Sequence, residues 1–284
     1  MMKVAVIGHV EWTRIARVDR IPTSGDIVHA DVSWQGPAGG GAVAAVQLAK
    51  LAGRCAFFTA LGDDLHGRNA RSILERQGVD VLAAIRDAPT RDAFALIEAG
   101  GERTTTTFGA RLQPSYHDLL PWDRLGDYDA IYFSAGDAPL LRSARASQTL
   151  VITAREMSCA SAAGIFLDSV VGSSRDREEA YDPSLLKAPP TVLVTTDGPQ
   201  GGRYAIRGGP WLPYSPAAPP GPAIDCYGAG DSFAAALTFG LARFDDIPSA
   251  VALAARCGAA CIAGAGPFSR QLRVDEPSLE DLFI

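Results

Sequence analysis

The chain lacks the basic tracts that would connect it to nucleic acid or to an anionic membrane. Its 284 residues include 26 Lys or Arg against 32 Asp or Glu, which gives a formal net charge of −6. No apolar stretch is long enough to span a bilayer. The composition therefore gives no support to a nucleic-acid partner or a membrane location, and it is typical of an ordinary globular protein.

Several short catalytic and metal-binding motifs are also missing. None of the three lysines follows a glycine, so no Walker loop is present, and there is no HExxH or CxxC. Ser232 lies in a Gly-Asp-Ser-Phe block like that of some serine esterases, but every histidine precedes it and the strained elbow is absent. The five scattered cysteines argue against a disulfide framework, and Cys257 and Cys261 are favoured as small core residues over metal ligands.

Strand-like and helix-like segments alternate along most of the chain. The first apolar run, Val4–Gly8, is too short for a signal peptide, so we expect a buried strand there and a cytoplasmic protein. Helices are expected at 42–53 and 67–79, each ended by a glycine, with further short apolar runs after them. This alternation predicts an α/β fold with a central, mostly parallel sheet flanked by helices.

Two segments interrupt the alternation. Ile21–Trp34 alternates like a strand around a proline and a glycine. Arg91–Phe108 predicts two strands joined at Gly100–Gly101, which is a hairpin signal. These strands fit either a small separate sheet, such as a lid, or an extension of the main sheet at its edge, and the pattern alone favours neither.

A turn of small residues, Gly228-Ala229-Gly230, leads into Asp231 and an expected helix. The first N–H groups of a helix are unpaired and lie at its positive end, and side chains no larger than methyl let a phosphate approach them. A carboxylate beside that phosphate can accept the proton of an attacking hydroxyl. The alternative is that Asp231 or Ser232 only caps the helix.

Four sequence blocks together resemble the ribokinase-like (PfkB) carbohydrate kinases. The family pattern D-T-x-G-A-G-D-[ST]-F corresponds to Asp225–Phe233, and G-G-x-G-A-N corresponds to Ala38–Val43. G-D-D-x-x-G occurs at Gly62–Gly67 and T-x-G-x-x-G at Thr196–Gly201. Each glycine block alone is a weak signal, but all four occur in the family's order and spacing over nearly the whole chain.

The resemblance implies a ribokinase-like fold in one domain over 1–284, with lid strands inserted at about 11–35 and 89–110. It implies an ATP-dependent kinase that transfers the γ-phosphoryl group to a hydroxyl of a small sugar-like metabolite. Asp231 would be the general base, and the N–H groups of Gly228, Ala229 and Gly230 would form the anion hole.

The resemblance also implies a nucleotide side. Thr196, Gly198 and Gly201 would lie along the phosphates and ribose of ATP. The family's N-x-x-E, which organises Mg²⁺ through water, corresponds to Ser173–Asp176, so that Asp176 would keep the charge on a shorter arm. Backbone carbonyls around Asp225 could hold a monovalent cation such as K⁺.

The chain departs from the family mainly on the acceptor side. The aspartate of the sugar-binding N-x-D is Thr13, which cannot accept two charge-assisted hydrogen bonds, and Glu11 would replace it from a different direction. Val43 replaces the asparagine of the glycine-rich block. The residues expected to contact the acceptor are Glu11, Thr13, Gly39, Gly40, Gly41, Val43 and Arg91.

Three of these side chains leave alternatives open. Trp12 offers a flat face to a sugar or base, or it packs within the lid; Tyr227 reaches toward the acceptor or packs beneath its loop. Arg91 suits an acidic or phosphorylated acceptor if it faces the cleft, and is otherwise a solvated lid residue. A nucleoside kinase of the same fold and a catalytically idle, ligand-sensing homologue remain alternative functions. Exposed lid edges also suggest a homodimer formed lid to lid.

Overall fold

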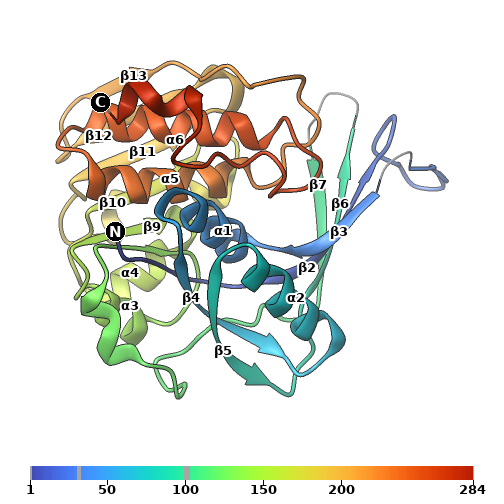
Figure 1. The fold of residues 1–284 in the computed structure, drawn as a ribbon, viewed down its shortest axis with the longest axis horizontal. Helices are drawn as coiled ribbons and strands as arrows, with labels where there is room; N and C mark the ends of the chain where they lie inside the picture. The colour runs from blue at the N-terminus through green and yellow to red at the C-terminus, as the bar shows by residue number, and fades with distance from the viewer. Residues whose placement is uncertain (1, 31–32, 99–102, 284) are drawn as a thin grey trace.

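A nine-stranded sheet forms the centre of the fold in the computed structural model, which describes residues 2–30, 33–98 and 103–283 (Figure 1). Its strands are β1 (Val4–Ile7), β4 (Cys55–Gly62), β5 (Val79–Arg86), β8 (Ala130–Phe133), β9 (Thr149–Thr153), β10 (Ser169–Ser173), β11 (Val192–Thr196), β12 (Gly202–Ile206) and β13 (Trp211–Tyr214). Their order is β13-β12-β11-β10-β9-β8-β1-β4-β5. The seven neighbouring strands β11, β10, β9, β8, β1, β4 and β5 are parallel to one another. Strands β12 and β13 extend the sheet with antiparallel pairing, so the predicted mostly parallel sheet is confirmed.

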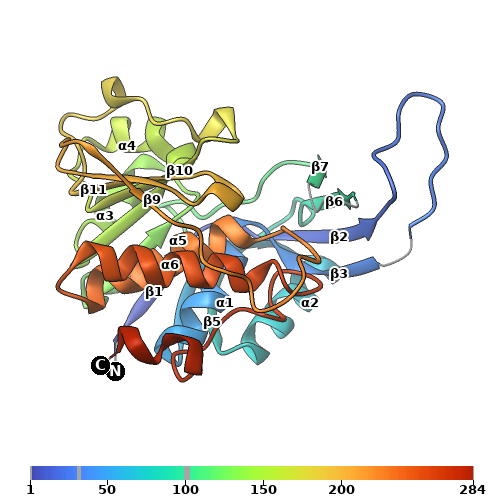
Figure 2. The same cartoon turned by 90° about the horizontal axis from the view of Figure 1, so that it is seen from above.

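Helices cover both faces of this sheet, as Figure 2 shows. The helices are α1 (Gly40–Ala52), α2 (Leu65–Arg76), α3 (Ala138–Ala144), α4 (Met157–Ala163), α5 (Ala229–Arg243) and α6 (Ile247–Cys261). One core layer joins α1, α2, α5 and α6 to the sheet, and the other joins α3 and α4 to the opposite face. Strands covered on both sides are apolar along their length, which is why β1 and β4 are wholly buried. Among the described helices, none has the length and apolar character needed to cross a bilayer.

Short 3₁₀ helices connect several of these elements. They are η1 (Trp122–Asp127), η2 (Ala154–Glu156), η3 (Arg177–Glu179), η4 (Pro183–Leu185), η5 (Gly198–Gln200) and η6 (Pro277–Leu282). Two of them, η2 and η5, directly follow the carboxyl ends of β9 and β11. Ligands of open parallel sheets bind at the carboxyl ends of the strands, so these turns lie at the edge where a site is expected.

A second, four-stranded sheet projects from one side of the body (Figure 1 and Figure 2). It contains β2 (Glu11–Arg17), β3 (Ser33–Ala38), β6 (Asp92–Ile97) and β7 (Arg103–Phe108), in the order β3-β2-β6-β7. The pairs at its edges are antiparallel, and β2 and β6 are parallel. Arg91–Phe108 therefore supplies two strands of a separate sheet, and an edge extension of the main sheet is wrong. The strand expected over Ile21–Trp34 is also wrong for most of its length: residues 21–30 form no strand, and only the last two residues of the segment enter β3. The predicted turn at Gly100–Gly101 lies outside the described residues.

The outer strand of this lid is β7, and all six of its residues are exposed. An unpaired strand edge is a template for a second chain. The lid-to-lid homodimer rests on this feature and stays a prediction.

Asp64 joins the start of α2 to the hinge of the lid. Its carboxylate accepts hydrogen bonds from the N–H groups of Gly67 and Thr90, both at 2.6 Å, and from the Thr90 hydroxyl at 2.9 Å. Thr90 is two residues before β6, so the Gly-Asp-Asp block anchors the chain where it enters the lid. Burial raises the pKa of Asp64, but these hydrogen bonds outweigh it and leave the pKa lowered.

We expect Asp64→Ala to lower the free energy of unfolding by about 1–2 kcal/mol, because a helix cap and a hinge contact are both lost. The native carboxylate contributes this stability above about pH 4, and the contribution declines as the pH falls through its lowered pKa. Urea unfolding measures the effect. Asp182→Ala is the matched control, since Asp182 caps η4 without a lid contact. An equal loss of unfolding free energy in both variants would contradict the additional contact of Asp64 with Thr90.

Candidate functional site

The glycine-rich loop before α1 lies against the segment that follows β1. A Cβ atom on Gly41 would lie 2.7 Å from the backbone N and O of His9. Gly39 is the N-cap of α1 with φ 86°, and a Cβ there would lie 3.1 Å from the His9 ring. Only glycine fits these positions, because the close approach excludes a side chain at Gly41 and the positive φ disfavours one at Gly39. His9 is thereby brought into the site, although the sequence analysis did not assign it a role.

Asp231 lies in the first turn of α5 and does not cap it. The N-cap is Gly228, in the left-handed conformation with φ 84°, and no side chain caps the helix. The cap interpretation of Asp231 and Ser232 is therefore wrong. Within the described residues, the N–H groups of Gly230 and Asp231 find no hydrogen-bond acceptor. Because a Cβ on Gly230 would meet no atom within 4 Å, there is open space in front of these groups.

The Asp231 carboxylate faces the glycine-rich loop. A Cβ on Gly40 would lie 3.0 Å from Asp231 Oδ1, so the helix starts of α1 and α5 approach each other at this point. Burial raises the pKa of Asp231, and the charges of Arg103 and Arg155 oppose that rise. A carboxylate with a raised pKa next to an unfilled helix N-terminus can act as a general base toward a hydroxyl bound between the two loops.

Glu11, Arg91 and His9 form one cluster of side chains beside the glycine-rich loop. Arg91 Nη1 lies 3.2 Å from Glu11 Oε1, and His9 Nε2 lies 3.7 Å from the same oxygen. Burial raises the pKa of Glu11, which is 6% exposed, and Arg91 is the main opposing charge. Burial, together with the neighbouring arginine charges, lowers the pKa of His9 to about 3, so its imidazole is neutral. Arg91 is therefore paired with a buried carboxylate and is not a fully solvated lid residue, while its contact with an acceptor stays a prediction.

Glu11 and Thr13 share one face of β2, because residues two apart on a strand point the same way. Glu11 thus lies on the same face as Thr13, one step closer to β1, and its approach to an acceptor stays a prediction. Thr13 itself is fully buried, and its Oγ1 lies 3.4 Å from the hydroxyl of Tyr227. The Thr13 hydroxyl is therefore occupied by a contact within the protein and has no exposed surface.

Val43 packs against the Gly228–Gly230 turn. It is 0% exposed and belongs to a small lid cluster that also contains Ile15 and Tyr227. A Cβ on Gly228 would lie 3.0 Å from Val43 Cγ1. Val43 and Thr13 therefore shape the acceptor side by packing, since neither presents a surface to a ligand. Tyr227 packs beneath its loop, as one of its two interpretations proposed.

Trp12 packs on the opposite face of β2. Its ring stacks on His66 with centroids 4.9 Å apart and an interplanar angle of 6°. His66 Nδ1 lies 3.2 Å from Asp92 Oδ1, so the imidazole links α2 to β6. Trp12 is thus occupied by packing at the base of the lid and offers no free face to a base or a sugar.

The Thr196–Gly201 block forms the tight turn between β11 and β12. The Thr196 hydroxyl donates to the Gly172 carbonyl at 3.3 Å. Gly201 has φ 82°, and a Cβ there would lie 2.3 Å from the carbonyl oxygen of Tyr214. A Cβ on Gly198 would lie 3.0 Å from Arg175 Cζ. The turn is held at the carboxyl end of β11, on the same edge of the sheet as the strand ends beside Asp231.

Arg155 gathers three carboxylates near this edge. It forms ion pairs with Asp176 and Glu178 and donates to Glu179 at 3.0 Å. Burial raises the pKa of Glu179, Arg155 opposes the rise, and the charge of Asp231 adds to it. The charge of Asp231 thus acts on Glu179, whereas Asp176 pairs with Arg155 and caps η3.

Sequence reasoning missed Glu179. The spacing of the N-x-x-E pattern selects Asp176, and the acidic run offers no signal for which carboxylate turns inward. Among the described residues, no group of three or more His, Cys, Asp or Glu side chains could hold a metal by itself.

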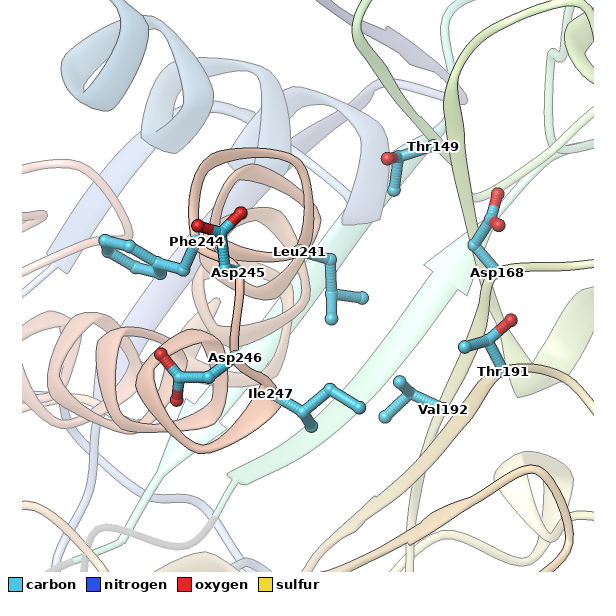
Figure 3. A pocket seen from close by; sticks show the side chains of 9 residues that line it. All are labelled: Thr149, Asp168, Thr191, Val192, Leu241, Phe244, Asp245, Asp246 and Ile247. Carbon is cyan, nitrogen blue, oxygen red and sulfur yellow. The ribbon is translucent and has the colours of Figure 1, made fainter.

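A separate hollow lies at the other end of the sheet (Figure 3). Thr149, Asp168 and Thr191 border it where β9, β10 and β11 begin, so it is remote from the glycine loops at the opposite strand ends. Leu241 and Ile247 form its other wall. Asp168 is already paired with Arg145 at 2.6 Å and accepts the Leu150 N–H at 2.7 Å. This hollow therefore has no part in the site described above.

Comparison with known proteins agrees with this geometry. The model of the pfkB family of carbohydrate kinases matches residues 1–173 and 167–270. The chain belongs to this family. Among curated pfkB-type relatives, the aminoimidazole riboside kinase of Salmonella typhimurium is 34% identical over 140 residues, which cover 48% of this chain and 40% of that protein. The fructokinase of Klebsiella pneumoniae is 29% identical over 272 residues, covering 79% of this chain and 85% of that protein.

The fold is that of the ribokinases. The structure of the Arabidopsis thaliana ribokinase complexed with ribose and ATP superposes with a TM-score of 0.77. The match covers 99% of each chain at 17% identity. The predicted pfkB family and ribokinase-like fold are thus confirmed, and the lid has a counterpart in a known architecture.

Proposed function

We propose that this pfkB-family protein transfers the γ-phosphoryl group of ATP to a hydroxyl of a small sugar-like metabolite, with Asp231 as general base. The observation that carries the proposal is the start of α5. There a half-buried carboxylate stands beside two N–H groups without acceptors and an open space at Gly230. A phosphate in that space would be stabilised by the N–H groups and the helix dipole.

The reaction needs one proton transfer and one displacement. The acceptor hydroxyl would bind between Gly40 and Asp231, and Asp231 takes its proton as the oxygen–phosphorus bond forms. The bond between the γ-phosphorus and the bridging oxygen breaks, and ADP leaves with that electron pair. The N–H groups of Gly230 and Asp231 stabilise the charge on the transferring group, which is the main contribution a protein makes to phosphoryl transfer.

ATP would lie along the Thr196–Gly201 turn, and Mg²⁺ would accompany it. The lack of a three-ligand side-chain cluster among the described residues fits a metal that is bound mainly by phosphate oxygens and water. Glu179 would hold such an ion through water, with Asp176 next to it. The metal would supply positive charge to the phosphates, while Arg155 keeps the carboxylates in place.

A monovalent cation fits the loop before the anion hole. The buried Asp225 carboxylate accepts the N–H groups of Tyr227 at 2.8 Å and Gly266 at 3.2 Å, which holds two loops together. The backbone carbonyls there supply the hard oxygen ligands that K⁺ takes. We expect replacement of K⁺ by tetramethylammonium, at constant ionic strength, to lower kcat/KM roughly tenfold, equivalent to about 1.4 kcal/mol.

The same exchange should lower the melting temperature, because the cation binds only the folded loops. Differential scanning fluorimetry in the two salts measures this shift without any turnover. Identical melting temperatures and identical rates in the two salts would contradict the cation site.

The aromatic contacts favour a sugar-like acceptor over a nucleoside. Trp12 is stacked on His66, and Tyr227 is buried and hydrogen-bonded to Thr13. Neither ring is free to stack a base. The presence of Asp231 next to the N–H groups of Gly230 and Asp231, which have no acceptor among the described residues, likewise argues against an idle sensor. A sensor would need neither a general base nor these donors.

The direct test is a screen for acceptor-dependent ADP release with Mg-ATP over sugars, sugar acids and nucleosides, preceded by a thermal shift with Mg-ATP. We expect ATP to raise the melting temperature and at least one polyol to stimulate ADP release. Turnover confined to nucleosides would favour the nucleoside kinase. ATP binding with no stimulated release by any acceptor would favour the sensor.

A further inference from the structure

Arg103 begins β7, and its guanidinium lies over the ring of Tyr227. Its Cζ is 5.0 Å from the centroid of the Tyr227 ring, in the residue directly before the anion-hole turn. Burial raises the pKa of Glu11, Asp225, Tyr227 and Asp231, and the charge of Arg103 lowers the pKa of each. A cation that acts on all four groups lies at the mouth of the cleft between the lid and α5.

The other arginines around the cleft are already paired with carboxylates. The pairs are Arg91 with Glu11 at 3.2 Å, Arg111 with Glu156 at 3.1 Å, and Arg155 with Glu179 at 3.0 Å. No ion pair within the described parts of the chain includes Arg103. Its guanidinium is held by the Tyr227 ring and keeps its five N–H donors for a ligand.

Two buried nitrogens in the same cleft also lack a hydrogen-bond partner among the described residues. They are Nε of Arg91 and Nδ1 of His9. The guanidinium Nε can only donate, and a neutral imidazole nitrogen can donate or accept. Arg91 is fixed in place, because its other nitrogens bind Glu11 and the hydroxyl of Thr107 on β7. Buried donors without acceptors are rare, so their presence here points to ligand oxygens.

We propose that the acceptor is an anionic polyol, whose carboxylate or phosphate group is bound by Arg103 and Arg91 while Glu11 accepts one of its hydroxyl groups. This rests on the proposed kinase function, because it describes the molecule that Asp231 deprotonates. Arg103 acts as a specificity residue here. A guanidinium binds a carboxylate or a phosphate by the same pair of parallel hydrogen bonds, so the two share one site.

The position of the lid explains why this residue can select the substrate. Arg103 lies in the edge strand β7, and Arg91 comes immediately before β6, so both belong to the lid. An anion that binds both would hold the lid over the cleft and exclude water during transfer. A neutral sugar would leave Arg103 without a counter-charge and would gain neither contact.

The test compares matched acceptors that differ in one charge. ADP release is measured with neutral sugars, the corresponding aldonic acids and the corresponding monophosphates at saturating Mg-ATP. We expect the anionic member of at least one set to exceed the neutral member in kcat/KM by about tenfold or more. The sugar-acid and phosphate arms show which anion the site accepts.

Arg103→Gln should lower kcat/KM for the anionic acceptor about 10- to 100-fold, mainly by raising KM. The kcat/KM for the neutral acceptor should change little. Arg103→Lys should restore part of the loss, because it keeps the charge but loses the fork. Arg14→Gln is the matched control, since Arg14 is an exposed lid arginine on the opposite face of β2. Equal rates for neutral and anionic acceptors in wild type and Arg103→Gln would overturn the inference.

A binding measurement separates this inference from the kinase proposal. Thermal shifts with the same acceptors and a non-hydrolysable ATP analogue need no turnover. An anion-dependent shift that Arg103→Gln removes supports the inference even if no acceptor is phosphorylated, in which case only the kinase proposal fails. Neutral sugars that are phosphorylated and shift both proteins as strongly as anions would leave the kinase proposal standing and overturn the inference.

Discussion

Asp231→Asn is expected to lower kcat by roughly 10²–10⁴-fold, the contribution typical of a general base. The affinity for ATP should stay close to that of the wild type, because the N–H groups of the α5 turn and the Thr196–Gly201 turn are unchanged. Coupled ADP release gives the turnover, and titration calorimetry gives the affinity for ATP. Retention of near-normal turnover on a good acceptor would contradict the role of Asp231.

The same variant should become more stable while it loses activity. Burial raises the pKa of Asp231 in the folded protein. A group with a raised folded pKa stabilises the protein fully below its unfolded pKa, and this contribution is lost as the pH rises through the folded pKa. At neutral pH the ionised carboxylate therefore destabilises the folded protein, and replacement by the neutral asparagine removes this destabilisation. We expect the melting temperature to rise and the acid limb of the wild-type pH–rate profile to lie above about pH 3.9.

Asp246→Asn is the matched control for this pair of effects. Asp246 caps α6 by accepting the Ser249 N–H at 2.8 Å, and hydrogen bonding lowers its pKa. Asparagine caps a helix about as well as aspartate, so this variant should keep both its melting temperature and its turnover, unlike Asp231→Asn. A fall in both stability and turnover for Asp231→Asn would show that the carboxylate is structural.

Gly40→Ala is the second variant with a large expected effect. The added methyl group would lie 3.0 Å from Asp231 Oδ1, in the space where the acceptor hydroxyl must approach the base. Gly40 is the first residue of α1 and its φ is not positive, so alanine meets no backbone strain there. We expect kcat/KM to fall by about 10²-fold, as misplacement of reacting groups by an ångström does, with no loss of thermal stability.

Gly126→Ala is the control for this substitution. A Cβ on Gly126 would make only ordinary contacts, at 3.6 and 3.8 Å, with Ala146. It should leave kcat/KM unchanged when both variants are measured with the same acceptor. A Gly40→Ala protein as active as Gly126→Ala would show that the acceptor does not pass between Gly40 and Asp231.

The parts of the fold and site that the sequence predicts are those where the backbone itself sets the requirement. Gly39 and Gly228 adopt positive φ angles and lie close to neighbouring atoms. Glycine is therefore required at these positions, and its presence in the sequence predicts a turn. Strand ends followed by glycine turns likewise predict the parallel sheet. The turn that we propose binds phosphate before Asp231 can be proposed from the sequence, because N–H groups and small residues within a few positions would carry its chemistry.

The acceptor side could not be predicted, because its contacts join residues far apart in the chain. Thr13 and Tyr227 are 214 positions apart in the chain and are joined by a hydrogen bond. Tyr227 also packs against Val43, so these departures from the family pattern lie in one packed cluster. Local patterns also carry no information on which carboxylate of an acidic run turns inward, as Glu179 does, or on the burial that keeps His9 neutral.

The measurement that tests the central claim most directly is transfer of the γ-phosphoryl group from labelled ATP to an acceptor in a single turnover. Wild-type protein is mixed with γ-labelled ATP, Mg²⁺ and each acceptor, and the label is followed into the acceptor, with Asp231→Asn in parallel. We predict a labelled phosphate ester in the wild type and at least a roughly 10²-fold slower formation in the variant. Label that remains in ATP with every acceptor, or equal transfer by both proteins, would contradict the account.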